Sequence, residues 1–201
     1  MTRRTRLVAA LAFGMIVTAA PASAQFQSDG YKFLDAVRNA KNDDVISAVE
    51  KPGSRIVDTR DRSTGEGALH IVVRRSDSAY LSYLLTHGAD PNLRDDKGNS
   101  PLLLAATLGQ ETMIQPLLTA HANPNLANSS GETPLIIAVQ RRDTQMVRQL
   151  VAAGANPDQR DVIAGLSARE YASRDTRSPF LAKLLDEAPA RPKAGVAGPK
   201  L

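Results

Sequence analysis

Three histidines and the aspartates near them are the side chains of this sequence best suited to acid–base or metal chemistry. They are His70, His87 and His121, with Asp77, Asp90, Asp95 and Asp96 as possible carboxylate partners. An imidazole paired with a carboxylate can act as a general base, and imidazole also binds zinc. The chain has no cysteine, the other usual zinc ligand, and it has no glycine-rich phosphate loop, nucleophile elbow or H-E-x-x-H helix. Chemistry at these residues therefore requires a fold that gathers them.

A regular interval in the sequence indicates which elements carry these side chains. Positions 33 residues apart form two sets, which are Gly65, Gly98 and Gly131, and Gly88, His121 and Gly154. The segments GADPN, HANPN and GANPD occupy residues 88–92, 121–125 and 154–158, and the apolar pairs that precede them keep the same register. A fixed interval of this length is the signature of a repeat architecture.

Each cluster of turn-forming residues marks the start or the end of a helix. Ser100-Pro101 and Thr133-Pro134 are typical helix starts, because the hydroxyl caps unpaired backbone N–H groups and the proline ring suits the first turn. Gly88 and Gly154 are placed to end helices in the left-handed conformation, and the prolines that follow prevent continuation. A unit of two short helices cannot bury its apolar face alone, so the units must stack into an all-α solenoid.

The stretches GNSPLLLAATLGQ and GETPLIIAVQRRD, each followed by one of the segments above, resemble ankyrin repeats. The resemblance covers about residues 31–188 and implies helix-turn-helix units with β-turn fingers. The full repeats would be 62–94, 95–127 and 128–160. A divergent capping repeat at 31–61 would precede them, and a divergent terminal repeat at 161–188 would follow a one-residue insertion.

One match to the family pattern and two departures from it carry predictions. His70 resembles the family's structural histidine, whose ring joins the turns of adjacent repeats, and His87 and His121 lie elsewhere in their repeats. We therefore predict no catalytic residue, no metal ligand and no cofactor. His121 replaces the glycine preferred at a helix end, which predicts mild backbone strain. Pro116 lies inside the second helix of its repeat without an N–H to donate, which predicts a kink or a late helix start.

The beginning of the chain is typical of a secretory signal. Residues 1–24 combine three arginines, an apolar run from Leu7 to Ala20 and a small-residue A-x-A site, which predicts cleavage between Ala24 and Gln25. The apolar run is shorter than the roughly 20 residues of a membrane-spanning helix, so we expect no stable membrane insertion after cleavage. Residues 25–30 would form a short mature N-terminal segment, and the expected location is a bacterial periplasm or the medium outside the cell.

The basic excess of the chain comes from its two ends, and this excludes one class of partner. Residues 189–201 contain three prolines and two glycines, which predicts a flexible tail. This tail and residues 1–24 hold three basic residues each, which leaves 19 basic against 21 acidic residues in 25–188. Nucleic-acid binding draws on clustered lysine and arginine, so we predict no nucleic-acid partner.

The resemblance also implies a binding surface, because partners of ankyrin proteins usually contact the finger tips and the exposed positions of each first helix. Carried over by repeat position, the tips are Ser63, Thr64 and Glu66, then Asp96, Lys97 and Asn99, then Ser129, Ser130 and Glu132. The helix positions are Arg74, Arg75, Thr107, Leu108, Gln140 and Arg141. The three arginines are the leading predicted contacts, because guanidinium makes paired hydrogen bonds and stacks on rings. The alternative is that they only solubilise the surface.

Together these observations predict a monomeric, non-enzymatic ankyrin-repeat protein of the secreted or periplasmic bacterial type. It would bind a protein partner through the concave face and the finger tips. Two alternatives of other classes stay open. An enzyme would need a dispersed site built across several repeats, and a structural or stress-protective protein of the cell envelope would need no specific site.

Overall fold

The computed structural model describes residues 22–52 and 55–188. In this part the chain begins with α1 (Ala22–Arg38), α2 (Asn42–Val49) and the 3-10 helix η1 (Ile56–Asp58). Four further helix pairs follow, which are α3 (Ala68–Arg74) with α4 (Ser78–Thr86), α5 (Pro101–Leu108) with α6 (Glu111–Thr119), α7 (Pro134–Gln140) with α8 (Thr144–Ala152), and α9 (Ala168–Arg174) with α10 (Pro179–Asp186). The described residues form two isolated β-bridges and no strand, so the predicted all-α solenoid of stacked helix pairs is confirmed.

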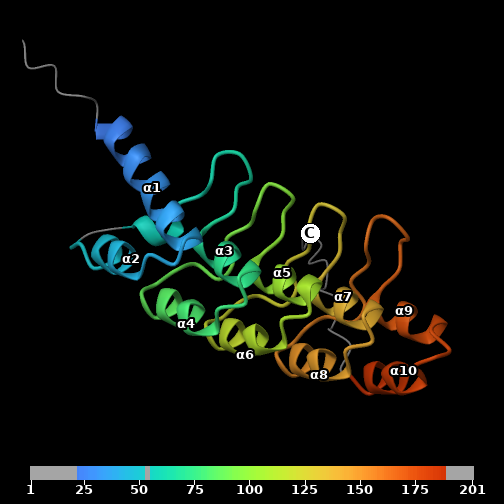
Figure 1. The fold of residues 1–201 in the computed structure, drawn as a ribbon. Helices are drawn as coiled ribbons and strands as arrows, with labels where there is room; N and C mark the ends of the chain where they lie inside the picture. Colours follow the sequence, from blue (N-terminus) through green and yellow to red (C-terminus); the bar gives the residue numbers. More distant parts are fainter. Residues whose placement is uncertain (1–21, 53–54, 189–201) are drawn as a thin grey trace, which may run out of the picture.

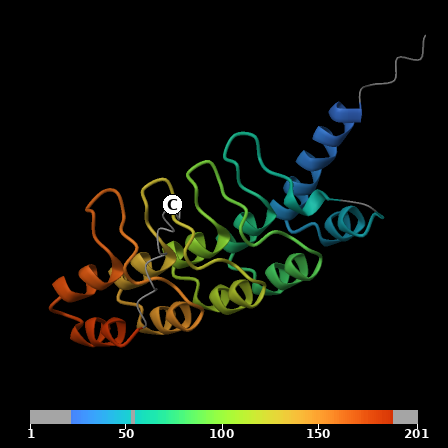
Figure 2. The ribbon, with the colours of Figure 1, turned by 180° about the vertical axis from the view of Figure 1, so that it is seen from behind.

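The helices lie in two rows, and long loops extend from one of them (Figure 1). The inner helices α3, α5, α7 and α9 pack side by side, and the outer helices α4, α6 and α8 do the same. The loop before each inner helix extends away from the helices as a finger, and the four fingers stand next to one another in both views (Figure 2). The fingers are residues 61–66, 95–99, 128–132 and 161–166.

The predicted helix starts and stops are confirmed. The hydroxyl of Ser100 accepts the N–H of Leu103 at 3.2 Å, and that of Thr133 accepts the N–H of Ile136 at the same distance. Beyond the ends of the outer helices, Gly88, His121 and Gly154 have φ angles of 83°, 64° and 85°. The left-handed conformation costs nothing at glycine but is strained at His121, as its place in the repeat predicts.

The core runs along the interface between the two helix rows. Helix α5 lies between α3 and α7 and against α6, and six of its eight residues are buried. Ala105, Ala106 and Ala138 are completely inaccessible to solvent, and their small side chains let neighbouring inner helices approach closely. Burial on several sides explains why α5 is apolar nearly all round and shows no single apolar stripe.

The last residue of the GADPN-type segments joins each repeat to the next. The Asn92 side chain accepts the N–H of Asn123 at 2.7 Å and donates to the carbonyl of His121. The Asn125 side chain makes the same two bonds one repeat later, to the N–H of Asn156 at 2.6 Å and the carbonyl of Gly154. These ladders satisfy backbone groups at the ends of the outer helices, where no helical partner exists.

The prediction for Pro116 is wrong. Helix α6 begins at Glu111 and continues through Gln115 and Pro116 to Thr119. Pro116 is the sixth residue of a nine-residue helix, so the one hydrogen bond it cannot donate would go to the carbonyl of Thr112. Thr112 is exposed, and water can replace the missing donor there, which makes the proline tolerable without a break.

The N-terminal repeat differs from the others. Helix α1 packs against α3 in the place of a preceding inner helix and buries Phe33, Leu34 and Val37. It is 17 residues long and is helical where the other repeats have their finger. The predicted segment 25–30 and the Ala24–Gln25 bond lie within this helix. Residues 1–21 of the predicted signal and the predicted tail at 189–201 lie outside the described residues.

Candidate interaction surface

The backbone shape of each finger is set by the residue that begins it. In the second finger, the buried carboxylate of Asp95 accepts the N–H groups of Lys97 at 2.9 Å and Asn99 at 2.7 Å. The Asp161 carboxylate of the last finger accepts three N–H groups at 2.7–3.0 Å, and Asp61 and Asn128 act alike in the other two fingers. A left-handed glycine with φ between 66° and 80° then closes each loop.

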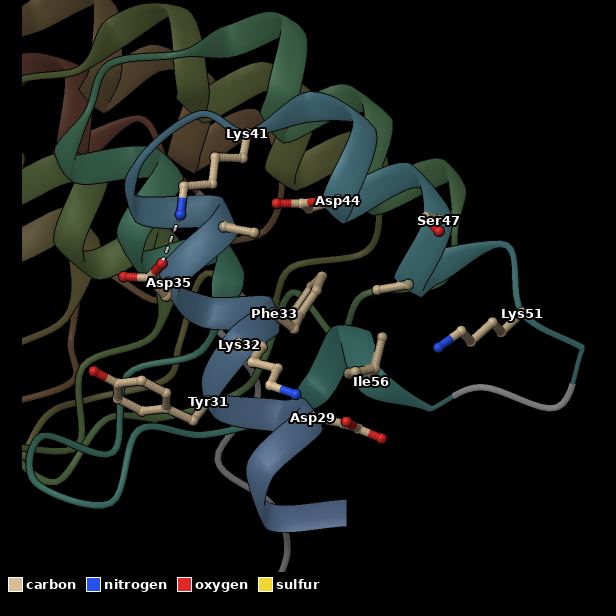
Figure 3. Close-up of a pocket in the computed structure, with 12 residues that line it drawn as sticks. Asp29, Tyr31, Lys32, Phe33, Asp35, Lys41, Asp44, Ser47, Lys51 and Ile56 are labelled. Atoms are coloured by element: carbon tan, nitrogen blue, oxygen red, sulfur yellow. Dashed lines mark hydrogen bonds and ion pairs between the residues drawn. The ribbon is translucent and has the colours of Figure 1, made fainter. Parts of the chain in front are cut away.

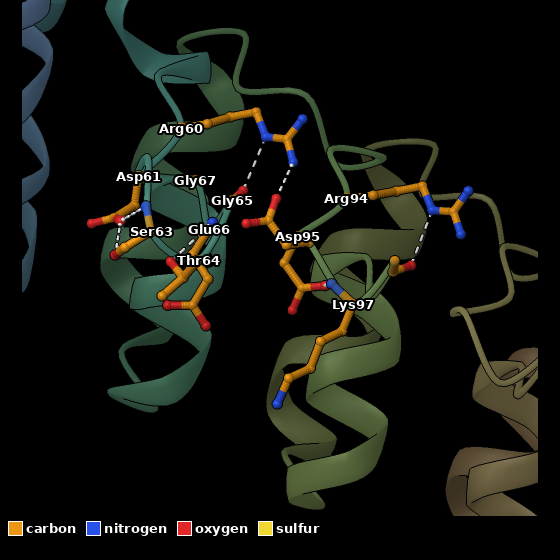
Figure 4. A network of polar contacts seen from close by, with 12 residues as sticks. Arg60, Asp61, Ser63, Thr64, Gly65, Glu66, Gly67, Arg94, Asp95 and Lys97 are labelled. Atoms are coloured by element: carbon orange, nitrogen blue, oxygen red, sulfur yellow. Dashed lines mark hydrogen bonds and ion pairs between the residues drawn. The ribbon is translucent and has the colours of Figure 1, made fainter.

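Neighbouring fingers are joined by one backbone hydrogen bond at each joint. The N–H groups of Asp96, Ser129 and Val162 donate to the carbonyls of Thr64, Lys97 and Ser130 at 2.9–3.0 Å. Arginines at the base brace three of the fingers. Nε of Arg60 and Nε of Arg94 donate to the carbonyls of Gly65 and Gly98 at 3.0 Å (Figure 4), and the Arg160 guanidinium donates to the carbonyl of Gly165. The fingers therefore form one connected row.

His70 supports the second finger from within. Its side chain is completely buried, its Nδ1 accepts the N–H of Gly67 at 3.2 Å, and its Nε2 donates to the carbonyl of Asn99 at 2.9 Å. These partners require the neutral ring. Burial lowers the pKa of His70, and the Asn99 carbonyl opposes that change without reversing it. The predicted structural role, joining the turns of adjacent repeats, is confirmed.

The predicted tip residues divide into two groups. Those with exposed side chains are Ser63, Thr64, Asp96, Lys97 and Ser129. Glu66, Asn99, Ser130 and Glu132 are half-buried, and three of them hold the fingers in shape. Glu66 pairs with Arg74, the Asn99 amide donates to Asp95 at 2.9 Å, and the Asn128 amide donates to Glu132 at 2.9 Å. The first group is therefore the better set for contact with a partner.

The three predicted arginines have different intramolecular partners. Arg74 is half-exposed and lies 2.7 Å from the Glu66 carboxylate of its own finger. Arg141 is exposed and donates to the carbonyl of Thr107 in the neighbouring repeat at 3.1 Å. Arg75 is half-buried, donates to the carbonyl of Val37, pairs with Asp77 and lies over the ring of Tyr80. Arg75 thus joins α1 to the second repeat, whereas Arg74 and Arg141 remain accessible at the surface.

The other predicted helix positions lie at the solvent-facing ends of the inner helices. Thr107 and Leu108 close α5, Gln140 closes α7, and all three are exposed. Leu108 keeps 40% of its surface accessible, which is a large exposure for leucine in a folded repeat. Arg174 occupies the matching end of α9 and extends this row, and the sequence prediction omitted it.

The sequence prediction also omitted two exposed apolar residues. Val162 and Ile163 are 73% and 76% exposed at the tip of the last finger. The signal was present in the sequence as DVIAG at the place where earlier fingers read DDKGN and NSSGE. The insertion in this repeat hid the correspondence, because the last finger is one residue longer than the two before it.

The described residues do not gather a catalytic or metal-binding constellation. His70 is buried at the base of a finger, His87 follows α4 and His121 follows α6. No three histidine, aspartate or glutamate side chains in the described ranges lie close enough together to hold a metal ion.

The outer side of the N-terminal repeat carries a charged pocket of about 350 Å³ between α1 and α2 (Figure 3). Its charged lining residues are Asp29, Lys32, Asp35, Lys41, Asp44 and Lys51. The Lys41 ammonium lies 3.1 Å from the Asp35 carboxylate, and the pocket contains no histidine. Opposite charges alternate in this lining, so the pocket does not select a ligand of one charge.

Comparison with known proteins places the repeats in a broad set of sequences. The profile of the ankyrin-repeat family, which describes three copies of the repeat, matches residues 33–128, 69–161 and 102–193. An ankyrin repeat protein of Acanthamoeba polyphaga mimivirus is 39% identical over 72 residues, 35% of this chain and 10% of that protein. The BTB/POZ domain and ankyrin repeat-containing protein NH5.2 of Oryza sativa subsp. japonica is 37% identical over 74 residues, 37% of this chain and 15% of that protein.

The human relative is an enzyme, but the likeness covers a small part of it. The 2-5A-dependent ribonuclease of Homo sapiens is 36% identical over 81 residues, 40% of this chain and 11% of that protein. The aligned segments span 10 to 15% of the length of the viral, plant and human relatives.

The described helices include none that combines the length and the apolar character needed to cross a bilayer.

Ankyrin repeats generally mediate protein–protein interaction without chemistry of their own. Since the matches together run from residue 33 to residue 193, the chain belongs to the ankyrin-repeat family.

Proposed function

We propose that this chain is a non-enzymatic module that binds another protein through its finger tips and the exposed ends of its inner helices. The observation that carries this proposal is the separation of roles along each finger. Buried groups such as Asp95 and His70 hold the backbone, whereas the exposed side chains of Lys97 and Ser129 make no hydrogen bond or ion pair to it among the described residues. A rigid frame lowers the conformational entropy lost on binding, so the tips are prepared for a partner.

The ends of the inner helices supply the stronger anchors. Leu108 is exposed between two accessible arginines, Arg74 one repeat before it and Arg141 one repeat after it. Arginine and large apolar side chains account for much of the binding free energy at protein interfaces. Both arginines are already oriented by a hydrogen bond or an ion pair, which reduces the number of conformations lost when a partner binds.

The test is a charge reversal that leaves the fold intact. Arg74→Glu together with Arg141→Glu should abolish capture of the partner from an extract of the native cells and reduce its affinity at least tenfold in titrations with the purified partner. Arg75 is left unchanged because it joins α1 to the second repeat. The control is Lys51→Glu with Lys183→Glu. Both lysines are exposed; Lys51 follows α2, and Lys183 lies on α10. Equal binding by the two double variants, or no partner for the parent protein, would exclude this surface.

We further propose that the protein is exported and acts in the periplasm or outside the cell. The support is the order of features in residues 1–24, with arginines, an apolar run and an A-x-A site. Intact-mass analysis of the protein from fractionated cells should show a chain that begins at Gln25 in the exported fraction. A chain that retains Met1 and fractionates with the cytoplasm would refute export.

A further inference from the structure

We propose that this protein associates head to tail with a second copy of itself, with the tip of the last finger of one copy entering the groove beside the first finger of the next. The proposal goes beyond binding of a foreign partner and, apart from Ser63, uses different residues. Both halves of the contact are present on this chain, at opposite ends of the solenoid (Figure 1).

The first half is the apolar tip of the last finger. Val162 and Ile163 are the most exposed large apolar side chains in the described part of the chain, while the corresponding tips of the other fingers carry arginine, serine, threonine, aspartate and lysine. A terminal repeat normally presents a polar outer surface, because no further repeat covers it. Two neighbouring β-branched residues at this place therefore indicate a surface that another molecule covers.

The second half is a groove with a mostly apolar surface at the other end of the molecule, which Arg60, Asp61 and Arg62 also line. It has a volume of about 350 Å³ and lies between α1, which contributes Gly30, Tyr31 and Leu34, and the chain from Thr59 to Ser63. Helix α1 is helical where the other repeats have a finger, so the first finger has no finger before it and borders this groove instead. This volume corresponds to on the order of ten water molecules, which is room for two branched side chains.

The first and last fingers each have one backbone group that is paired in the other fingers but not here. Each later finger donates the N–H that follows its first residue to a carbonyl of the finger before it. In the first finger this N–H belongs to Arg62, and in the last finger the carbonyl equivalent to that of Thr64 belongs to Ala164. Neither group has a hydrogen-bond partner among the described residues, so one end offers a donor and the other an acceptor.

The glycines confirm that the last finger is open on its outer side. A Cβ atom on Gly131 would come within 2.8 Å of the Val162 nitrogen, because the last finger lies against it. A Cβ atom on Gly165 would meet no atom of the described chain within 4 Å. A second copy can therefore approach the last finger along a face that every other finger uses for its neighbour.

The contact is heterologous and small. Different surfaces meet, so each bound copy leaves one free tip and one free groove, and longer chains form as concentration rises. Helix α1 already occupies the place of a preceding inner helix, which limits entry to the finger tip. We expect a contact between one finger tip and one groove to bury less than the roughly 1,200 Å² of stable complexes, so association should be weak and concentration-dependent. This outcome differs from the monomer expected from the sequence.

The test measures the molar mass of the purified protein by sedimentation velocity over a concentration series. The parent protein should show a mass that rises with concentration, and two variants should each stay monomeric. The tip variant is Val162→Ser with Ile163→Ser, and the groove variant is Tyr31→Asp, at a side chain that is 67% exposed on α1. Both sets of substitutions lie at exposed positions, and unchanged circular dichroism and melting temperature establish that each variant is folded.

Mixing the two variants makes the test decisive. The tip variant keeps an intact groove and the groove variant keeps an intact tip, so a mixture should form one-to-one dimers and nothing larger. Phe180→Ser, which removes another exposed aromatic side chain on α10, should assemble like the parent. A parent protein that stays monomeric up to its solubility limit, variants that assemble like the parent, or a mixture that stays monomeric would each overturn the proposal.

Discussion

The second finger and the last finger share one backbone design but differ in what they present to solvent. Both begin with a buried aspartate that accepts N–H groups, both close on a left-handed glycine, and both donate one N–H to the finger before them. The second finger carries Asp96 and Lys97 at its tip, while the last carries Val162 and Ile163. The frame and the tip therefore depend on different residues, and the tip can change without loss of the frame.

The two fingers also differ in how they are supported. The second finger is held from the preceding repeat by the ring of His70, which donates to Asn99, and it has a neighbour on each side. The last finger is held from its own repeat by the hydroxyl of Tyr171, which donates to Asp161 at 2.6 Å, and it has a neighbour on one side among the described residues. The difference shows that a finger inside the row is held between two neighbours, whereas the last finger is held by the finger before it and by α9.

The largest expected effect compares how closely the third finger and the last finger are packed against a following finger. Gly131→Ala combines a left-handed backbone with a collision against the backbone of the last finger, and should lower the free energy of unfolding by about 2–5 kcal/mol. Gly165→Ala has the left-handed backbone without the collision and should cost about 1–2 kcal/mol. Urea unfolding followed by circular dichroism measures both. Equal losses would show that the third and last fingers do not touch as described.

The next effect compares the two supports. His70→Ala removes two hydrogen bonds and leaves a cavity in a fully buried site, so we expect a loss of about 2–4 kcal/mol in the free energy of unfolding. Tyr171→Phe removes one hydroxyl bond to Asp161 from a half-buried ring and should cost about 1 kcal/mol. The same urea titrations decide the order, and a larger loss for Tyr171→Phe would reverse the comparison.

The smallest effect is on the pH dependence of stability. His70, which supports the second finger, and Asp161, which is bonded to Tyr171 in the last finger, act in different ranges of pH. The pKa of His70 is lower in the folded protein than its ordinary value of about 6.5, so the unfolded chain binds more protons below that pH. The stabilisation from the neutral ring is complete above about pH 6.5 and is lost as pH falls toward the lowered pKa. Unfolding free energies measured from pH 8 to pH 5 should therefore decline, and His70→Ala should flatten this part of the curve.

Asp161 acts in a lower range of pH. Burial would raise the pKa of this carboxyl, but the bonds from the Tyr171 hydroxyl and from the backbone of Ala164, Gly165 and Ile163 outweigh burial and lower it. Its contribution is present above the ordinary pKa of about 3.9 and is lost as pH falls through the lowered value. A single transition near pH 4, with no decline between pH 6.5 and pH 5, would contradict the assignment for His70.

Much of the frame was predictable from the sequence because it depends on local chemistry. The caps at Ser100 and Thr133 and the helix ends at Gly88 and Gly154 follow from the dihedral angles and hydrogen bonds available to single residues. The role of His70 followed from its position in the repeat. Pro116 shows the limit of such reasoning, because its cost depended on whether one exposed carbonyl could bond to water.

The candidate surface was less predictable because exposure depends on neighbours that are distant in the sequence. Arg75 and Arg74 are adjacent in the chain, but Arg75 bonds to Val37 of α1 and Arg74 pairs with Glu66 of its own finger. Val162 and Ile163 occupy a finger position in the sequence, but the one-residue insertion hid their correspondence to the tips of the earlier fingers.

By itself, the sequence determined the 33-residue period, the helix starts and stops at the capping and glycine positions of the full repeats, and the stacked all-α architecture, since each depends on interactions within one repeat or on its recurrence. The tertiary structure decided which polar side chains hold the fingers, which remain accessible, and that the last finger ends in an uncovered apolar tip. The physical reason is that burial is a property of the stack. A side chain of given type is stabilising or exposed according to whether the next repeat covers it, and the final repeat has no successor among the described residues.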